Sequence, residues 1–438
     1  MKSCNYFKHF KNFKVLAAMI TILIFGIISC SDSNSPSEDE PFVIVKTETL
    51  DTNIINKKKI NAVDNPSEFD YHDLFDSIMK DTDGLIPYLV SSNVVKYKSI
   101  DNNGNTKELS GLFLYPTAAV QFDRIQTPIV CITHGTELLK RYAPSKWDFW
   151  NVSDWGNFAE VIIAGVMVSR YGWTVFMPDY QGMGDDTGEN HPYCVREKLA
   201  KSSADMIEKG IAMISNNKHP KVNWDGNLFV YGYSEGGFVS MAVTQELEKR
   251  NINVKGAVCM DGPYDLTGTM KDVMLSGKPF PIPYFLPLLL VGYNTIYPAN
   301  FQYNSMLKEP YRTNIPKYTD GFNKSDVVNG IMPSSKILKE VFLDSFIDSL
   351  NNSKSTIYGI LNQNNTFYNW APKSKMLLWH CKNDDCVPFG NFTAAKNAFL
   401  KEGASNITYI EWPEVSNWAN TVHVSVAPRA FYEGASWI

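Results

Sequence analysis

Ser234 is the residue of this chain with the clearest chemical setting, because it stands between two glycines in the stretch GYSEGG. A serine hydroxyl becomes a nucleophile when a neighbouring base takes its proton. The pattern G-x-S-x-G, here from Gly232 to Gly236, is typical of a nucleophile on a sharp turn between a strand and a helix. Glycines two positions before and after the serine leave room for the strained backbone of that turn. An ordinary glycine-rich loop is the alternative interpretation.

A nucleophilic serine needs a base, and on strand-turn-helix folds the expected order along the chain is serine, acid, histidine. Seven histidines are present, and only His380 and His423 follow Ser234. His380 ends the apolar run KMLLWH, whereas His423 lies in a segment that we expect to be a loop after the strand NITYIEW. For His423 alone, the alternative is a surface histidine without a catalytic role.

Two backbone amides are candidates for stabilising the oxyanion that forms when the serine attacks a carbonyl group. One is the N–H of Glu235, at the start of the helix expected after Ser234. The other is the N–H of Thr136, in HGTE at the end of another apolar run, where Gly135 permits a close turn. A plain tight turn is the alternative interpretation of HGTE.

The elements that must position these residues are visible as short apolar runs bounded by Gly or Pro. Such runs are typical of strands buried on both faces of a parallel sheet, and helical stretches alternate with them. An earlier pair of strand patterns flanks an Asn-Gly turn at 103–104 and predicts a hairpin. We therefore predict a doubly wound α/β sheet that opens with an antiparallel hairpin. The runs are TPIVCITHG at 127–135, GWTVFMPDY at 172–180, NLFVYGY at 227–233, VKGAVCMDG at 254–262, SKMLLWHC at 374–381 and NITYIEW at 406–412.

The strand rhythm is interrupted between residues 267 and 371, where Pro and aromatic residues are dense. The segment at 334–350, SSKILKEVFLDSFIDSL, predicts one amphipathic helix. We interpret 267–371 as a cap insertion over the carboxyl edge of the sheet, where α/β folds bind ligands. The core is then formed by 48–266 and 372–438.

Four stretches occur in an order that resembles the α/β-hydrolase superfamily, and within it the chain is similar to the secretory lipase group. The stretches are THGT at 133–136, PDYQGMG at 178–184 with HPY at 191–193 after it, GYSEGG at 232–237, and HCKNDDCVP at 380–388. In the second, Asp179 and His191 are expected to stabilise the loop. The resemblance implies a triad serine at Ser234 and an α/β-hydrolase fold with a helical cap.

The acid and the base follow from the last of these stretches, which resembles the H-G-x-x-D-x-x-V-P loop of the superfamily. By that resemblance Asp384 is the triad acid, His380 is structural, and His423 is the base. Asp385 and Asp261 remain alternatives for the acid. The sequence departs from the pattern at Cys381, which replaces the usual glycine, and no glycine precedes His423.

The N-terminus has the features of a secretory signal. Four lysines precede the apolar run VLAAMITILIFGII at 15–28, which is short for a bilayer span. The following Ser29-Cys30 resembles a bacterial lipobox, so we expect a signal peptide at 1–29 and a lipid attached to Cys30; an ordinary signal peptide is the alternative. Residues 30–47 are expected to be a flexible acidic tether, which would place a lipid-anchored protein in the bacterial cell envelope.

The composition limits the classes of partner that the chain is expected to bind. A net charge of -5 and a pI near 5.9 give no basic footprint for nucleic acid.

Cys131 and Cys259 are expected to be buried thiols, while Cys381 and Cys386 flank a short loop and allow a disulfide, with Cys194 as a competing partner. No C-x-x-C pair or histidine cluster has zinc-like spacing, so neither a metal nor another cofactor is expected.

The function favoured by these residues is carboxylic ester hydrolysis through an acyl-enzyme, on small-molecule, lipid or acylated-glycan esters. An exported serine peptidase of prolyl aminopeptidase or dipeptidyl peptidase type is the alternative, and its amine anchor would be Glu137 or Glu189. A non-catalytic surface binding lipoprotein is a third hypothesis. The sequence does not indicate an oligomeric state.

Overall fold

The computed structural model describes residues 42–50, 88–101, 103–118, 124–148 and 158–438. The expected signal peptide and Cys30 lie outside the described residues. The expected tether was wrong at its end, because residues 42–47 belong to a strand, β1 (Phe42–Leu50). Phe42 is buried there and packs edge-on against Phe176, so an apolar contact fixes this segment on the sheet.

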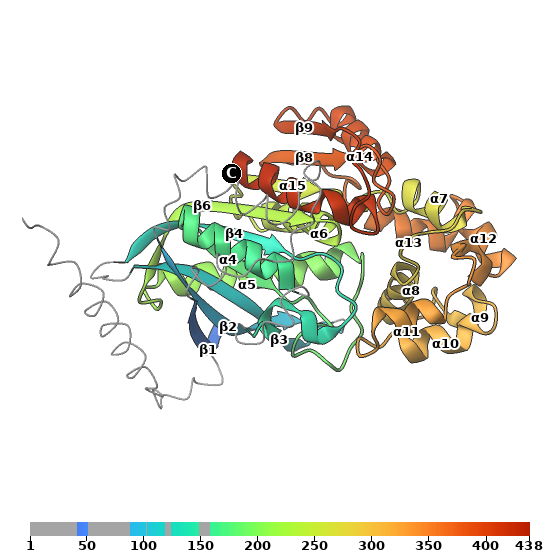
Figure 1. The fold of residues 1–438 in the computed structure, drawn as a ribbon, viewed down its shortest axis with the longest axis horizontal. Helices are drawn as coiled ribbons and strands as arrows, with labels where there is room; N and C mark the ends of the chain where they lie inside the picture. Colours follow the sequence, from blue (N-terminus) through green and yellow to red (C-terminus); the bar gives the residue numbers. More distant parts are fainter. Residues whose placement is uncertain (1–41, 51–87, 102, 119–123, 149–157) are drawn as a thin grey trace, which may run out of the picture. The chain divides into compact units, whose positions relative to one another are not determined.

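Within the described residues, nine strands form one sheet in the order β1-β2-β3-β5-β4-β6-β7-β8-β9 (Figure 1). The pairs from β1 to β5 along this order are antiparallel, and all pairs from β5 to β9 are parallel. The predicted hairpin is β2–β3, and each predicted buried run forms a strand. The strands after β1 are β2 (Leu89–Ile100), β3 (Thr106–Thr117), β4 (Ile125–Thr133), β5 (Thr174–Pro178), β6 (Val222–Tyr233), β7 (Gly256–Met260), β8 (Lys375–Cys381) and β9 (Ile407–Trp412).

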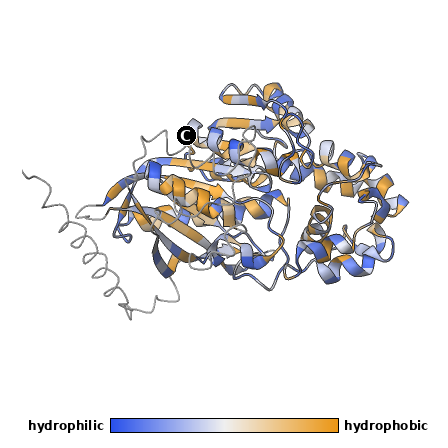
Figure 2. Cartoon of the chain, viewed as in Figure 1, coloured by the Kyte–Doolittle hydropathy of each residue, from blue (hydrophilic) through white to orange (hydrophobic). Residues whose placement is uncertain are grey.

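Helices cover both faces of the sheet, which explains why its central strands are continuously apolar (Figure 2). Val130 and Ile132 of β4 face α4 and α15, whereas Ile129 and Cys131 face α5 and α6. On the second face α14 joins the layer through Phe392. These helices are α4 (Ala159–Tyr171), α5 (Arg196–Ser215), α6 (Glu235–Lys249), α14 (Gly390–Lys401) and α15 (Val422–Trp437).

Residues 267–371 contribute helices and no strand of the sheet, and they gather at one end of it, shown yellow to orange in Figure 1. Short 3-10 helices occur at Lys140–Tyr142 and Pro144–Lys146 in the core and at Leu338–Val341 in this segment. Its α-helices are α7 (Thr269–Leu275), α8 (Phe285–Ile296), α9 (Tyr303–Met306), α10 (Tyr311–Tyr318), α11 (Ser325–Gly330), α12 (Asp344–Asn351) and α13 (Thr356–Asn364).

The single helix predicted at 334–350 was wrong, because a 3-10 turn and α12 replace it with a break at Phe342. Phe342 is fully buried and forms an isolated β-bridge with Leu307. The amide of Leu343 donates to the carbonyl of Met306 at 2.9 Å. Tertiary pairing of this backbone therefore overrides the local helical period.

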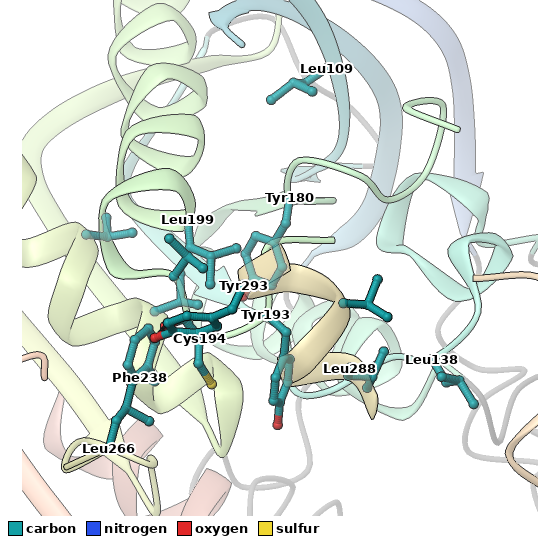
Figure 3. Close-up of a cluster of buried hydrophobic side chains, with 14 of the residues drawn as sticks. Leu109, Leu138, Tyr180, Tyr193, Cys194, Leu199, Phe238, Leu266, Leu288 and Tyr293 are labelled. Carbon is teal, nitrogen blue, oxygen red and sulfur yellow. Dashed lines mark hydrogen bonds between the residues drawn. The ribbon is translucent and has the colours of Figure 1, made fainter. Parts of the chain in front are cut away.

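A shared apolar cluster joins the insertion to the core (Figure 3). Tyr293 of α8 is fully buried beside Tyr193 and Cys194, and its hydroxyl donates to the carbonyl of Cys194 at 3.1 Å. Phe238 of α6 and Leu266 belong to the same cluster. The insertion is thus fixed against the loops that follow β5 and β7.

Among the residues that the structure describes, no helix combines the length and the apolar character needed to cross a bilayer.

Candidate active site

Ser234 occupies the turn between β6 and α6, with φ 60° and ψ -126°. This left-handed backbone is strained for a residue with a side chain and is typical of functional turns. A Cβ atom on Gly232 would lie 2.4 Å from the carbonyl oxygen of Gly236, and one on Gly236 would lie 2.1 Å from that of Thr133. Both flanking positions therefore have to be glycine, which favours the sharp turn over a glycine-rich loop.

His423 reaches Ser234 from the other end of the chain: its Nε2 lies 2.8 Å from the serine Oγ. The expectation of a loop was wrong, because His423 lies in the first turn of α15, whose cap Thr421 accepts the amide of Val424. The main-chain amide of His423 donates to Asp385, and its carbonyl accepts the hydroxyl of Tyr233 at 2.6 Å.

Asp384 lies in the loop after β8, and its Oδ2 lies 2.5 Å from Nδ1 of His423. Its Oδ1 accepts the amides of Cys386 and Val387 at 2.9 and 2.8 Å. Burial alone would raise the pKa of Asp384, but the adjacent His423 and these amides hold it below its ordinary value. The carboxylate is therefore ionised and faces the imidazole.

The structure thus brings the serine, histidine and aspartate together in one chain of hydrogen bonds. Their exposed fractions are only 8% for Ser234, 4% for His423 and 5% for Asp384, so these hydrogen-bonded side chains are largely shielded from water. Oδ1 of Asp385 accepts the main-chain amide of His423 at 3.2 Å and the thiol of Cys386 at 3.5 Å. Asp261 directly follows β7 and accepts the amide of Cys381 at 3.0 Å.

His380 is completely buried behind this chain, with Nε2 2.7 Å from the carbonyl of Val387 and 3.3 Å from Asp261. Burial lowers the pKa of His380 to about 4, so the ring is neutral at physiological pH. It supports the loop that carries Asp384 and does not contact Ser234.

Thr136 and Ser234 line the same cavity, as the oxyanion prediction requires. The Thr136 hydroxyl lies 3.0 Å from the Tyr193 hydroxyl. Glu235 follows Ser234 as the first residue of α6, so its amide lies at the N-terminus of that helix, while its side chain is fully buried. His191 approaches that side chain at 2.6 Å.

His191 also approaches the carbonyl of Gln181 at 3.2 Å, so it joins the loop at 178–184 to the residue after the serine. Asp179 in the same loop is fully buried and accepts the hydroxyls of Ser110 and Ser145 and the amide of Ser145. Both residues make the structural contacts expected of them.

Two residues near the site were not identified as functional from the sequence. Glu160, in the first turn of α4, accepts the amide of Gly135 at 2.8 Å and so holds the segment that carries Thr136. Burial raises the pKa of Glu160 to about 8. The ring of Tyr233 packs against His423 in a tilted arrangement, with ring centroids 5.0 Å apart. The only sequence signal for Tyr233 is its position immediately before Ser234.

The cavity in front of Ser234 has a volume of about 400 Å³. The insertion supplies part of its wall, together with aromatic side chains of the core and two carboxyl groups, Glu137 and Glu160. The apolar members of the wall include Tyr142, Phe158, Ile282, Tyr284, Phe285 and Phe431.

The cysteines within the described residues are all free and buried, so the possible disulfide between Cys381 and Cys386 is not formed, nor does either pair with Cys194. Ligating atoms of Asp261, His380 and Asp384 lie within 4.8 Å of one another, as do those of Asp384, Asp385 and Cys386. Both groups share Asp384, which is already bound to His423 and two amides.

Comparison with known proteins identifies the family of this chain. A profile of the secretory lipase family matches residues 159–438, which include Ser234, Asp384 and His423. The chain belongs to the secretory lipase family. Membership makes it a carboxylic ester hydrolase by class. A search of curated protein sequences found no match.

Solved structures share the architecture of this secretory lipase. A Legionella pneumophila protein named as a hydrolase is 24% identical at a TM-score of 0.70, and the match covers 90% of this chain and 96% of that one. The rice cell wall degrading esterase LipA from Xanthomonas oryzae is 19% identical at 0.68, over 90% and 98%. Candida antarctica lipase A in its closed state is 14% identical at 0.57, over 85% and 76%. The predicted α/β-hydrolase fold is confirmed.

Proposed function

We propose that this chain hydrolyses carboxylic esters through a Ser-His-Asp triad and an acyl-enzyme. The observation that carries the proposal is the hydrogen-bond chain from Ser234 through His423 to Asp384 at the wall of the cavity. His423 takes the proton of Ser234 as the hydroxyl attacks the acyl carbon, and Asp384 stabilises the imidazolium that forms. His423 then returns the proton to the leaving alcohol.

The negative oxygen of the tetrahedral intermediate requires donors. We assign this role to the amides of Glu235 and Thr136, the first at the N-terminus of α6 and the second in the segment held by Glu160. Water then enters, gives a proton to His423 and releases the acid from the acyl-enzyme. No metal or organic cofactor takes part in this scheme.

The cavity wall supports an acyl substrate with some polar character. Its aromatic and aliphatic side chains suit an acyl chain, and Glu137 and Glu160 offer partners for hydroxyl groups. Esters of lipids and acyl groups on glycans both fit this description. The related architecture of a cell wall degrading esterase supports the glycan option.

A serine peptidase is the second candidate, because Glu137 lines the cavity where an amine anchor would be needed. Glu189, the other suggested anchor, is instead bound to Lys107 at 2.9 Å and to Gln181 at 2.6 Å. Burial beside Glu160 and Glu235 raises the pKa of Glu137 well above its ordinary value. This shift disfavours the ionised form of Glu137 that would pair with an ammonium group, so the ester substrate is favoured.

The test is a turnover comparison on the full-length, detergent-solubilised protein. We expect p-nitrophenyl esters to be hydrolysed faster than aminoacyl anilides, with Ser234→Ala inactive. Ser202→Ala is the matched control, because its buried hydroxyl bonds only carbonyls of its own helix. Faster anilide turnover would favour the peptidase, and no turnover of either class would leave only the surface binding lipoprotein.

We further propose that the protein is exported and held in the cell envelope by a lipid on Cys30. Two observations support this proposal. Lysines precede an apolar run at the N-terminus, and the chain matches the secretory lipase family. Metabolic labelling with a fatty-acid probe should mark the wild type and not Cys30→Ser. Equal labelling of both proteins would contradict the anchor.

A further inference from the structure

Asp261 is a second buried carboxyl group directly behind the triad that the proposed mechanism does not use. It directly follows β7, is fully buried, and adopts a left-handed backbone with φ 42°. Its amide donates to the carbonyl of Trp379 at 3.1 Å, which fixes this strained backbone against β8. Oxygen atoms of Asp261 and Asp384 lie within 4.8 Å of each other.

Within the part of the chain that the structure describes, the groups around Asp261 provide no cation that could balance two carboxylates. Oδ1 of Asp261 accepts the amide of Cys381, and His380 is neutral beside it. The remaining titratable neighbours are Tyr233, Tyr264 and Cys381, and each bears no charge at neutral pH because burial raises its pKa. The imidazole of His423 is bound to the other side of Asp384.

Two carboxylates this close in a buried site cannot both ionise readily, so one keeps its proton. Asp384 accepts two amides and the imidazole, and these hold it ionised. Burial and the charge of Asp384 instead raise the pKa of Asp261 well above its ordinary value. Oδ2 of Asp261 is buried without a partner, which leaves it as the oxygen able to carry the proton.

We propose that Asp261 is a positioning residue for the triad, a neutral carboxylic acid whose O–H donates to Asp384 and fixes the carboxylate that orients His423. The proton stays on the pair throughout the cycle: no bond forms or breaks at Asp261, and it does not contact the substrate. The acid of this triad is therefore a pair of carboxyl groups that holds one proton. The inference rests on the proposed triad and adds to it the residue that directly follows β7, the strand beside β8.

Two variants distinguish the effect of the hydrogen-bond donor at Asp261 from the effect of the side chain's volume. Asp261→Asn keeps a donor of the same shape, so kcat should remain close to the wild-type value. Asp261→Ala removes the donor and should lower kcat by about 10- to 100-fold, the range seen when a partner that orients a metal-bound histidine is lost. KM should change little, because Asp261 does not line the cavity.

The decisive measurement is infrared spectroscopy of the full-length protein labelled with ¹³C-aspartate at neutral pH. The wild type should show the band of a protonated aspartic acid, and Asp261→Asn should lack it. Asp265→Asn, which removes a carboxylate bound to the amides of Gly268 and Thr269, should retain the band.

Absence of a protonated band in the wild type would overturn the proposal, and so would a loss of kcat in Asp261→Asn as large as in Asp261→Ala. If Asp261→Ala does not fold, the band in the wild type and in Asp261→Asn still decides. The band is measured without turnover. Failure of this proposal is therefore distinguishable from failure of the triad, for which Ser234→Ala would remain active.

Discussion

At the scale of single residues, the site depends on contacts that keep His423 in one orientation. The imidazole is bound at both ring nitrogens, while its main chain is bound by Asp385 and by the hydroxyl of Tyr233. Buried polar bonds of this kind cost free energy when one partner is removed. The Tyr233 hydroxyl is therefore expected to serve both stability and catalysis.

Tyr233→Phe tests this contact. We expect the free energy of unfolding to fall by about 1–3 kcal/mol, the cost of an unsatisfied buried acceptor, and kcat to fall as His423 loses its fixed position. Tyr231→Phe is the control, because that hydroxyl also donates to a carbonyl of α15, at Phe431, and not to His423. Urea denaturation and ester kinetics should show a stability loss in both variants and a kinetic loss only in Tyr233→Phe.

Glu160 is expected to make the free energy of unfolding depend on pH. Its pKa is raised from 4.5 to about 8 in the folded protein. Between these values the folded state binds a proton that the unfolded state has lost, so the contribution of Glu160 to stability is present at low pH and decreases as pH rises to about 8. Glu160→Gln does not titrate and should lose less stability over this range. Denaturation at several pH values measures this, with the exposed Glu402→Gln as control; equal slopes for all three proteins would contradict it.

At the scale of elements, the strand-turn-helix from β6 to α6 sets the position of Ser234, the proposed nucleophile. The turn requires close approach of α6 to β4, since a Cβ on Gly236 would meet the Thr133 carbonyl at 2.1 Å. Thr133 also donates its hydroxyl to the Gly236 carbonyl at 2.7 Å. A larger residue would force these elements apart.

Gly236→Ala should therefore destabilise the protein by about 1–3 kcal/mol, the usual cost of overpacking a core, and reduce activity. Gly165→Ala is the matched control in α4, where a new Cβ meets nothing within 4 Å. That variant should be neutral or more stable, by up to about 1 kcal/mol, because alanine favours helix. Thermal denaturation distinguishes the two, and equal melting temperatures would contradict the close approach.

Much of this arrangement could be predicted from the sequence, because local patterns encode it. Buried strands appear as continuous apolar runs, and the spacing of glycines around Ser234 reflects a steric requirement. The role of Glu160 could not be predicted, because its partner Gly135 lies 25 positions away and meets it only in the fold. The helix expected across Phe342 failed for the same reason, since its bridge to Leu307 is a tertiary contact.

At the scale of the whole molecule, the insertion at 267–371 completes the cavity that the core begins. Phe285 of α8 lines the cavity in front of Ser234 and also a second cavity of about 50 Å³. The second cavity is mainly apolar, with Met270, Met274 and Leu286 among its lining residues. Phe285 therefore stands between the catalytic cavity and space that could hold more of an acyl chain.

Phe285→Ala should join the two cavities and shift the preference toward longer acyl chains. We expect kcat/KM for long p-nitrophenyl esters to rise relative to acetate. Phe322→Ala, an exposed aromatic of the insertion that lines neither cavity, is the control. An unchanged chain-length profile in Phe285→Ala would show that the second cavity takes no part in acyl binding.

The central claim is that Ser234 carries the acyl group between the two halves of the reaction. Rapid quenching of the wild type with a p-nitrophenyl ester, followed by peptide mass spectrometry, measures this directly. We expect the acyl mass on the peptide that contains Ser234, with a burst of p-nitrophenol that matches the amount of enzyme. An acyl group on another residue, or ester turnover that persists in Ser234→Ala, would contradict the account.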